Sequence, residues 1–169
     1  MRSPRISPRF TERARARRAK RGAAIVHATD FSAASRGALA QAIAFAQRAR
    51  ARLAIIHVLM PPSPFVSGEP PRSWVELEAA ARRDAERRLD AAVAAARRAG
   101  AMADGTLVDG SPAESIANAA RRIGAQLIVI GTHGRSGLGR MFMGSVASGV
   151  LHLAGCPVLT VRGRARSTA

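Results

Sequence analysis

The sequence predicts one α/β domain with a five-stranded, doubly wound parallel sheet, strand order 3-2-1-4-5 and helices on both faces. Two observations predict it: five short apolar runs rich in Val, Ile and Leu, and segments of helical character between successive runs. Strands that alternate with helices pair in parallel through right-handed crossovers. The expected strands are residues 23–29, 53–59, 102–108, 126–130 and 157–161.

Helix signals fill the intervals between these strands. The first helix starts after Asp30 and Ser32 and runs to about Arg50. The second begins near Trp74, after a proline-rich loop, because Ser73 and Glu76 have the spacing of a capping box, and it ends at Gly100. The third runs from Ser111-Pro112 to Gly124, and the fourth follows a glycine-rich loop. The expected inner faces, at positions i, i+4 and i+7, are Leu39, Ile43 and Ala46; Leu89, Val93 and Ala96; and Val146, Val150 and Leu153.

Strand order reverses between the first and fourth strands of such a sheet. Doubly wound proteins bind ligands at this switch point, beyond the carboxyl ends of the strands. The loops that start at Thr29 and Gly131 are therefore expected to form the binding site.

The glycine-rich loop after the fourth strand has the character of an anion-binding loop. Gly131 and Gly134 allow unusual backbone angles and a close approach of ligand to the main chain. Gly144 and Ser145 stand at the start of the last helix, where free amides and the positive dipole end favour phosphate. Arg135 can add charge-assisted contacts.

Two better-known phosphate loops do not fit this sequence. It has no Gly-Lys-Ser or Gly-Lys-Thr, which excludes a Walker A loop. The glycines at 134, 137 and 139 do not form G-x-G-x-x-G and follow the fourth strand, which disfavours a Rossmann dinucleotide site.

The glycine spacing instead resembles the motif of the universal stress protein family: glycine, two residues, glycine, nine residues, then glycine with Ser or Thr. Gly131, Gly134 and Gly144-Ser145 match it in full. Residues 28–32 are similar to the family's opening motif, His57-Val58 to its second-strand ending and residues 155–159 to its closing strand. The resemblance covers about residues 23 to 162.

This resemblance implies an adenine nucleotide as ligand, ATP or else AMP or ADP, with any Mg or Mn carried by the nucleotide. Asp30 would lie near the base or ribose, and Arg135 is a further neighbour of the site. The nucleotide-binding residues implied by position are Ala28, Thr29 and Asp30 beside the adenosine, Val58 at the adenine, Ile130 and Gly131 at the base and ribose, and Gly134, Gly144, Ser145, Val146 and Ala147 at the phosphates. The family resemblance also implies a homodimer, and the last strand is the expected edge that pairs with its twin.

The predicted function is a cytoplasmic, nucleotide-binding regulatory protein of the stress response. No general base, nucleophile or arginine finger is recognisable from spacing, so ATP hydrolysis is expected to be slow at most, with no catalytic or metal-ligating residue assigned. An enzyme that activates substrates with ATP is the least favoured reading, because the pyrophosphatase-type loop SGGxDS is missing after the first strand.

The charge distribution supports a different hypothesis, a nucleic-acid-associated protein that acts through Arg-rich tails. The net charge is +16, but +8 of it lies in residues 1–21 and +3 in residues 162–169, which leaves +5 for residues 22–161. We expect residues 1–21 to be a disordered basic tail, residues 22–162 to be the universal stress protein domain and residues 163–169 to be a flexible tail. The basic tail has two readings, an anionic-surface tether or a solvated extension.

Several single residues keep two interpretations. Asp30 is either a ligand contact or the N-cap of the next helix, and Ser145 either accepts a phosphate or serves in simple hydrogen bonding and helix capping. His27 and His57 are interpreted as core histidines in preference to a metal pair, since no third ligand has sensible spacing. Trp74 is expected to pack at its helix start, in preference to covering the proline-rich loop or contacting ligand. Cys156 is expected to be a small buried hydrophobe.

Overall fold

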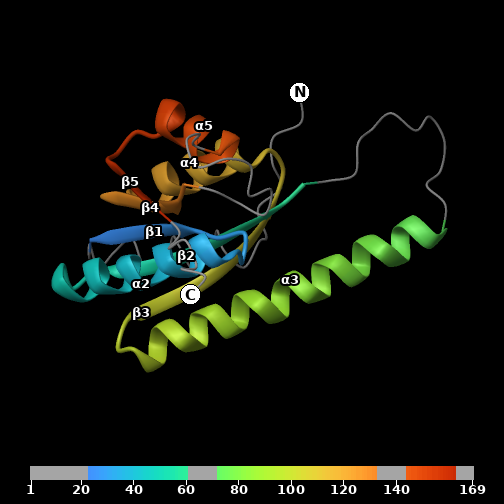
Figure 1. Cartoon of the computed structure of the whole chain (residues 1–169), viewed down its shortest axis with the longest axis horizontal. Coiled ribbons are helices and arrows are strands. Elements are labelled where there is room, and N and C mark those ends of the chain that lie inside the picture. Colours follow the sequence, from blue (N-terminus) through green and yellow to red (C-terminus); the bar gives the residue numbers. More distant parts are fainter. Residues whose placement is uncertain (1–22, 61–71, 133–143, 163–169) are drawn as a thin grey trace, which may run out of the picture.

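The structure, a computed structural model, describes residues 23–60, 72–132 and 144–162. The expected tails and most of the proline-rich and glycine-rich loops lie outside the described residues. Strands and helices alternate along the chain (Figure 1). The elements are β1 (Ala24–Ala28), α2 (Ala33–Arg48), β2 (Arg52–Leu59), α3 (Arg72–Arg98), β3 (Met102–Asp109), α4 (Pro112–Ile123), β4 (Leu127–Gly131), α5 (Ser145–Leu153) and β5 (Val158–Val161).

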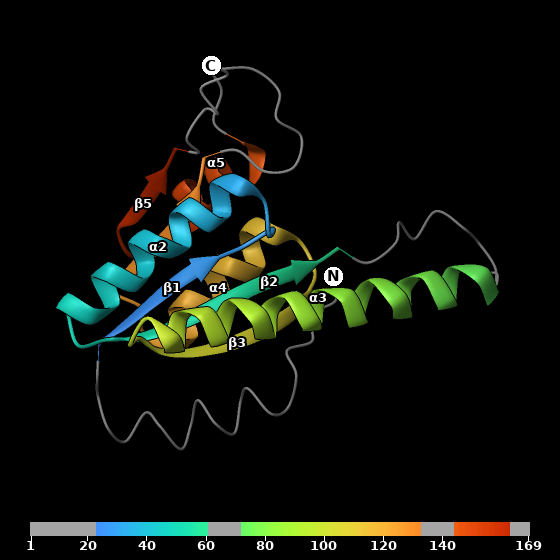
Figure 2. The same ribbon diagram turned by 60° about the horizontal axis from the view of Figure 1, so that its bottom comes forward.

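The five strands form one parallel sheet in the order β3-β2-β1-β4-β5, which confirms the predicted topology. Strand β1 is central and pairs with β2 on one side and β4 on the other, so Ala28 lies between Ile56 and Ile130. All strands therefore end at one edge of the sheet, the edge expected to carry the site (Figure 2).

A hydrophobic layer lies on each face of the sheet. Helices α2 and α3 cover one face, where Leu53, Ile55 and Val129 are fully buried. Helices α4 and α5 cover the other face over Val26 and Ile128. The many alanines in the helices bring the backbones close to the sheet, and burial of the β-branched strand residues between them stabilises the fold.

The helix ends follow the local signals in α2 and α4. The side chain of Ser32 caps α2 by accepting a hydrogen bond from the amide of Ser35. Pro112 stands at the start of α4, and Gly124 ends that helix in the left-handed conformation at φ +65°. In α3 the expected cap, Ser73, lies inside the helix, which starts one residue earlier at Arg72; such end positions shift by a residue because helix ends fray.

The expected inner face of α5 is wrong in part. Val150 is fully buried as predicted, but Val146 and Leu153 are exposed and Ala147 is buried instead. The reason is tertiary: α5 packs against α4 so closely that a Cβ on Gly149 would lie 2.7 Å from the Cβ of Ala113. Because of that close contact, the face of α5 that is buried is the one that carries its smallest residues.

Arg82 of α3 forms an ion pair with Asp109 at the end of β3, 2.5 Å away. Cys156 is only partly buried beside the α4–α5 layer, and desolvation raises the pKa of its thiol. Within the described part of the chain, no helix is long and apolar enough to cross a membrane.

Candidate functional site

The carboxyl edge of β1 and β4 is where the structure gathers most of the residues expected to bind a ligand. Ala28 and Ile130 are buried neighbours in the sheet register, and the chain continues into half-buried Thr29 and Gly131. A Cβ on Gly131 would lie 3.1 Å from the carbonyl carbon of Ala34, so β4 ends directly against the first turn of α2. The two loops therefore leave the sheet side by side.

A network of hydrogen bonds holds the turn between β1 and α2. The amide of Thr29 donates to the Ile56 carbonyl at 2.9 Å, which extends the β1–β2 pairing by one residue. The Thr29 hydroxyl oxygen accepts from the Phe31 amide at 3.0 Å and from the Ser35 hydroxyl at 2.7 Å. These bonds fix the position of the turn relative to both the sheet and α2.

Asp30 lies within this turn and is half-buried. One of its carboxylate oxygens, Oδ1, accepts a hydrogen bond from the Ser32 amide at 3.0 Å. The other, Oδ2, is buried and has no hydrogen-bond partner in the structure as described. Ser32, not Asp30, is the N-cap of α2, so the capping interpretation of Asp30 is wrong. A buried carboxylate oxygen without a partner is costly, and a ligand hydroxyl or amino group would satisfy it.

On the β4 side the chain leaves the sheet after Thr132 and returns at Gly144. The Thr132 amide donates to the Val161 carbonyl at 2.9 Å, and the Gly144 amide donates to the Thr132 carbonyl at 2.7 Å. These bonds place the start of α5 beside the end of β4. Gly134 and Arg135, predicted to contact phosphate, lie outside the described residues.

The first turn of α5 presents backbone amides at this edge. Gly144 is the N-cap and, among the described groups, no side chain caps the helix. Ser145 and Val146 are exposed, and Ala147 is buried. Because the first amides of a helix have no partner within it, residues 145–147 offer donors where the helix dipole is positive. The Gly144 amide itself is already used by Thr132.

Two histidines lie on the α2–α3 face of the sheet. His27 is fully buried, as predicted, and its Nδ1 donates to the Val129 carbonyl at 3.1 Å, while Nε2 has no partner among the described groups. Burial lowers the pKa of His27 from 6.5 to about 4, so the ring is neutral at pH 7. His57 is half-buried, next to Val58, and its Nδ1 donates to the Thr29 carbonyl at 2.7 Å. His57 therefore belongs to the support of the β1–α2 turn.

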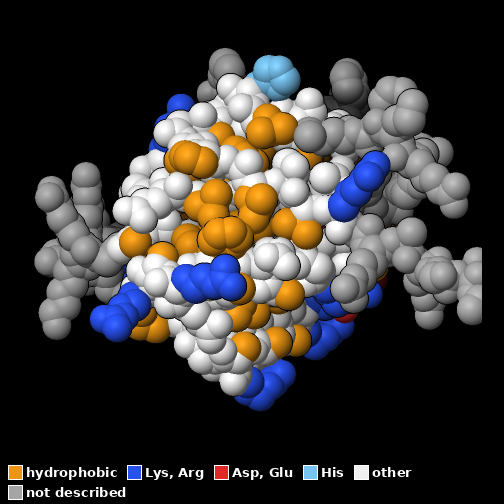
Figure 3. All heavy atoms as spheres, turned by 60° about the vertical axis from the view of Figure 1, so that its left-hand side comes forward, with side chains coloured by type: hydrophobic (Ala, Val, Ile, Leu, Met, Phe, Trp, Pro, Cys, Tyr) orange, Lys and Arg blue, Asp and Glu red, His pale blue; other side chains and the backbone are white. Residues whose placement is uncertain are grey.

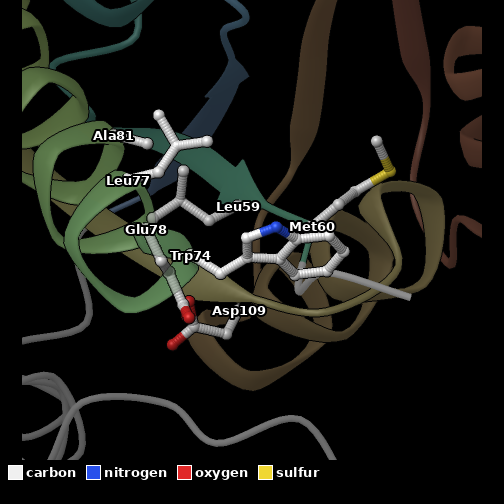
Figure 4. Close-up of a pocket in the computed structure, with 7 residues that line it drawn as sticks. All are labelled: Leu59, Met60, Trp74, Leu77, Glu78, Ala81 and Asp109. Carbon is white, nitrogen blue, oxygen red and sulfur yellow. The ribbon is translucent and has the colours of Figure 1, made fainter. Parts of the chain in front are cut away.

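A separate cavity of about 310 Å³ lies between α3 and the ends of β2 and β3 (Figure 4). Trp74 stands beside Met60 at one wall, and Glu78 and Asp109 lie together at another. Trp74 is half-exposed there, although the sequence predicted a packed residue at the helix start. Of the expected nucleotide-binding residues that the structure describes, none lines this cavity.

The sequence does not predict that Phe31, Ser35 and His57 support this turn. Phe31 and His57 lie in segments that resemble family motifs, residues 28–32 and 57–58, but those motifs do not indicate a contact between them, and Ser35 carries no such signal.

Fold and edge together define a doubly wound α/β protein whose candidate site lies at the switch point between β1 and β4. The sequence profile of the Universal stress protein family matches residues 23–162. The chain belongs to this family.

Known proteins agree with that assignment. A universal stress protein from Thermus aquaticus is 39% identical over 145 residues, which cover 82% of this chain and 97% of the relative. The solved structure of the hypothetical protein MJ0577 has a TM-score of 0.73 at 25% identity, covering 86% of this chain and 99% of the other. The universal stress protein from Archaeoglobus fulgidus, solved in complex with dAMP, has a TM-score of 0.57 at 25% identity and covers 83% of this chain and 98% of the other.

Proposed function

We propose that this protein binds an adenine nucleotide, ATP in the first place, at the carboxyl edge between β1 and β4. The observation that carries the proposal is the meeting of two complementary groups at one edge. The buried, unpartnered Oδ2 of Asp30 suits a donor on the ribose or base, and the amides of residues 145–147 suit phosphate oxygens. The similar protein from Archaeoglobus fulgidus, which holds dAMP, supports this choice of ligand class.

The remaining residues of the edge complete the proposed binding mode. Ala28 and Ile130 form an apolar floor for the nucleoside, and Val58 borders the adenine through its backbone. Gly131 has no side chain to hinder the approach of the ribose. Any Mg or Mn would arrive with the phosphates of the nucleotide.

The proposed role is regulatory: a cytoplasmic protein of the stress response that binds ATP and hydrolyses it slowly at most. The described polar groups of the turn support this role because they form hydrogen bonds with one another. Thr29, Ser35 and His57 are engaged in hydrogen bonds that position Asp30. A site that binds a nucleotide without consuming it allows the protein to alternate between a nucleotide-bound and a nucleotide-free state.

Isothermal titration calorimetry with ATP and AMP, in the presence of magnesium, tests the proposal. We expect saturable binding by the wild-type protein. Asp30→Ala should weaken the affinity by at least about tenfold, since hydrogen bonds to a charged group contribute more than neutral ones. Asp90→Ala, which removes an exposed carboxylate from α3, is the matched control and should bind like the wild type. Wild-type protein that shows no saturable binding of either nucleotide would contradict the proposed function.

We also propose a homodimer that pairs through β5. This strand lies at the edge of the sheet, and all four of its residues are only half-buried in the single chain. Hydrophobic side chains gather on the face of the molecule that carries this edge (Figure 3). An exposed edge with apolar surroundings favours pairing with a second copy. Light scattering at micromolar concentration should give the mass of a dimer, and a monomer mass would exclude this assembly.

A further inference from the structure

The backbone of Phe31, one residue after Asp30, adopts an unusual conformation. Its φ angle is +63°, in the left-handed region that aromatic residues seldom occupy. Such a conformation persists only where the surroundings hold it in place, and it is characteristic of functional sites. The contacts of the Phe31 backbone and ring therefore bear on the candidate site.

Both backbone polar groups of Phe31 are engaged. Its amide donates to the Thr29 hydroxyl oxygen at 3.0 Å, and its carbonyl accepts from Nη1 of Arg36 at 3.1 Å. With the peptide groups fixed in this way, the side chain points toward the α2–α3 layer, where it packs against the hydrophobic core.

The ring of Phe31 stacks on His57 of β2. The ring centroids lie 4.4 Å apart with an interplanar angle of 36°. His57 also donates from Nδ1 to the Thr29 carbonyl. One imidazole thus contacts the turn on both sides of Asp30, through a hydrogen bond to Thr29 and a ring contact with Phe31.

The other neighbour of the ring comes from α3. The guanidinium of Arg88 lies over Phe31, 6.0 Å from the ring centroid, within the range of a cation–π contact. Asp84, one turn earlier, holds Arg88 through Nε at 2.8 Å. A continuous set of contacts therefore runs from α3 through Arg88 and Phe31 to the turn that contains Asp30.

We propose that Phe31, His57 and Arg88 are positioning residues that couple the placement of α3 to the nucleotide affinity of the Asp30 turn. The inference rests on the proposed function and adds a means of regulation to it. Helix α3 is suited to this role because its first turns extend past the sheet, away from the body of the molecule (Figure 1). A shift of α3 would move Arg88 and release the ring that keeps the turn in its strained form.

A matched pair of arginine variants tests the coupling. Arg87 and Arg88 both pair with Asp84, at 2.9 and 2.8 Å, but Arg88 alone of these two contacts Phe31. We expect Arg88→Ala to weaken ATP binding roughly two- to fivefold, the size of an exposed cation–π contact. Arg87→Ala should leave the affinity unchanged. Equal affinities of the two variants would overturn the proposal.

A double-mutant cycle separates coupling from general loss of structure. Phe31→Asn keeps a residue type that tolerates the left-handed backbone but removes the ring, and should weaken ATP binding by roughly tenfold. In the Phe31→Asn background Arg88→Ala should have no further effect, because the ring through which it acts is gone. Independent, additive effects of the two substitutions would overturn the coupling while leaving the proposed function intact.

Hydrogen exchange of the nucleotide-free protein gives a readout that does not depend on binding. We expect Arg88→Ala, but not Arg87→Ala, to speed exchange of the Phe31 amide. If the wild-type protein fails to bind nucleotide, the proposed function is wrong, and exchange at Phe31 still decides whether α3 holds the turn. Unchanged exchange in Arg88→Ala would show that α3 does not hold the turn.

Discussion

The two halves of α3 meet different surroundings, although both consist of alanine, arginine, acidic residues and a few large apolar side chains. In the second half Ala85, Leu89 and Val93 are 4%, 5% and 7% exposed, because they lie on β2 and β3. In the first half Trp74 and Leu77 are 45% and 69% exposed. Figure 2 shows the first half extending past the ends of the strands.

This difference shows that an amphipathic pattern predicts a helix without predicting how much of it will be covered. The width of the sheet and the length of its strands determine how much of the helix is buried. Where helices cover the sheet even a polar ring such as that of His27 in β1 is fully buried, whereas Trp74, in the part of α3 beyond the sheet, is 45% exposed. Substitutions in and around the two halves should therefore have unequal effects on stability.

Truncation of one leucine in each half should give very different losses of stability. Leu89→Ala leaves a cavity between α3 and the sheet and should lower the free energy of unfolding by about 2–5 kcal/mol. Leu77→Ala removes an exposed side chain and should change it by no more than about 0.5 kcal/mol. Urea unfolding followed by circular dichroism measures both. Similar losses would mean that the first half of α3 is covered in solution.

The buried ring of His27 should make stability depend on pH. Its pKa is about 4 in the folded protein and 6.5 in the unfolded chain, so between these values the unfolded chain binds the proton more readily. The free energy of unfolding is therefore highest above pH 6.5, where the ring is neutral in both states. It falls by about 3 kcal/mol in all as the pH drops from 6.5 toward 4.

Unfolding free energies measured between pH 7 and pH 4 test this expectation. His27→Leu should flatten the curve in that window, because the titrating ring is gone. His152→Leu, which removes an exposed histidine from α5, should leave the slope in place. A slope that survives His27→Leu unchanged would place the titrating group elsewhere.

Gly105 tests how tightly the covered half of α3 lies on β3. A Cβ at this position would lie 2.9 Å from both Leu89 and Val93, so Gly105→Ala overpacks the contact. We expect a loss of about 1–3 kcal/mol, measured by urea unfolding. Gly37→Ala is the control, since no atom lies within 4 Å of its added Cβ and the residue is in a helix. It should be neutral or slightly stabilising.

Much of the candidate site could be predicted because its parts lie next to strand ends in the sequence. The apolar run before Gly131 identifies β4. Because the strand order reverses between β1 and β4, the loop after β1, which contains Asp30, is expected at the same site. Gly144 was correctly placed at the start of α5. What escaped prediction is how the turn is held, since His57 and Arg88 reach Phe31 from elements far away in the chain.

The amino-acid sequence alone is enough to predict the alternation of strands and helices, the order of the sheet and the edge where a ligand is expected. These follow from the period of apolar residues and from local helix signals such as Pro112 and Gly124, which act over a few residues. Packing between distant elements sets the exposure of the first half of α3, the buried face of α5 and the left-handed backbone of Phe31. Each of these features depends on how closely separate elements pack, and the periodicity of apolar residues along the chain does not predict that packing distance.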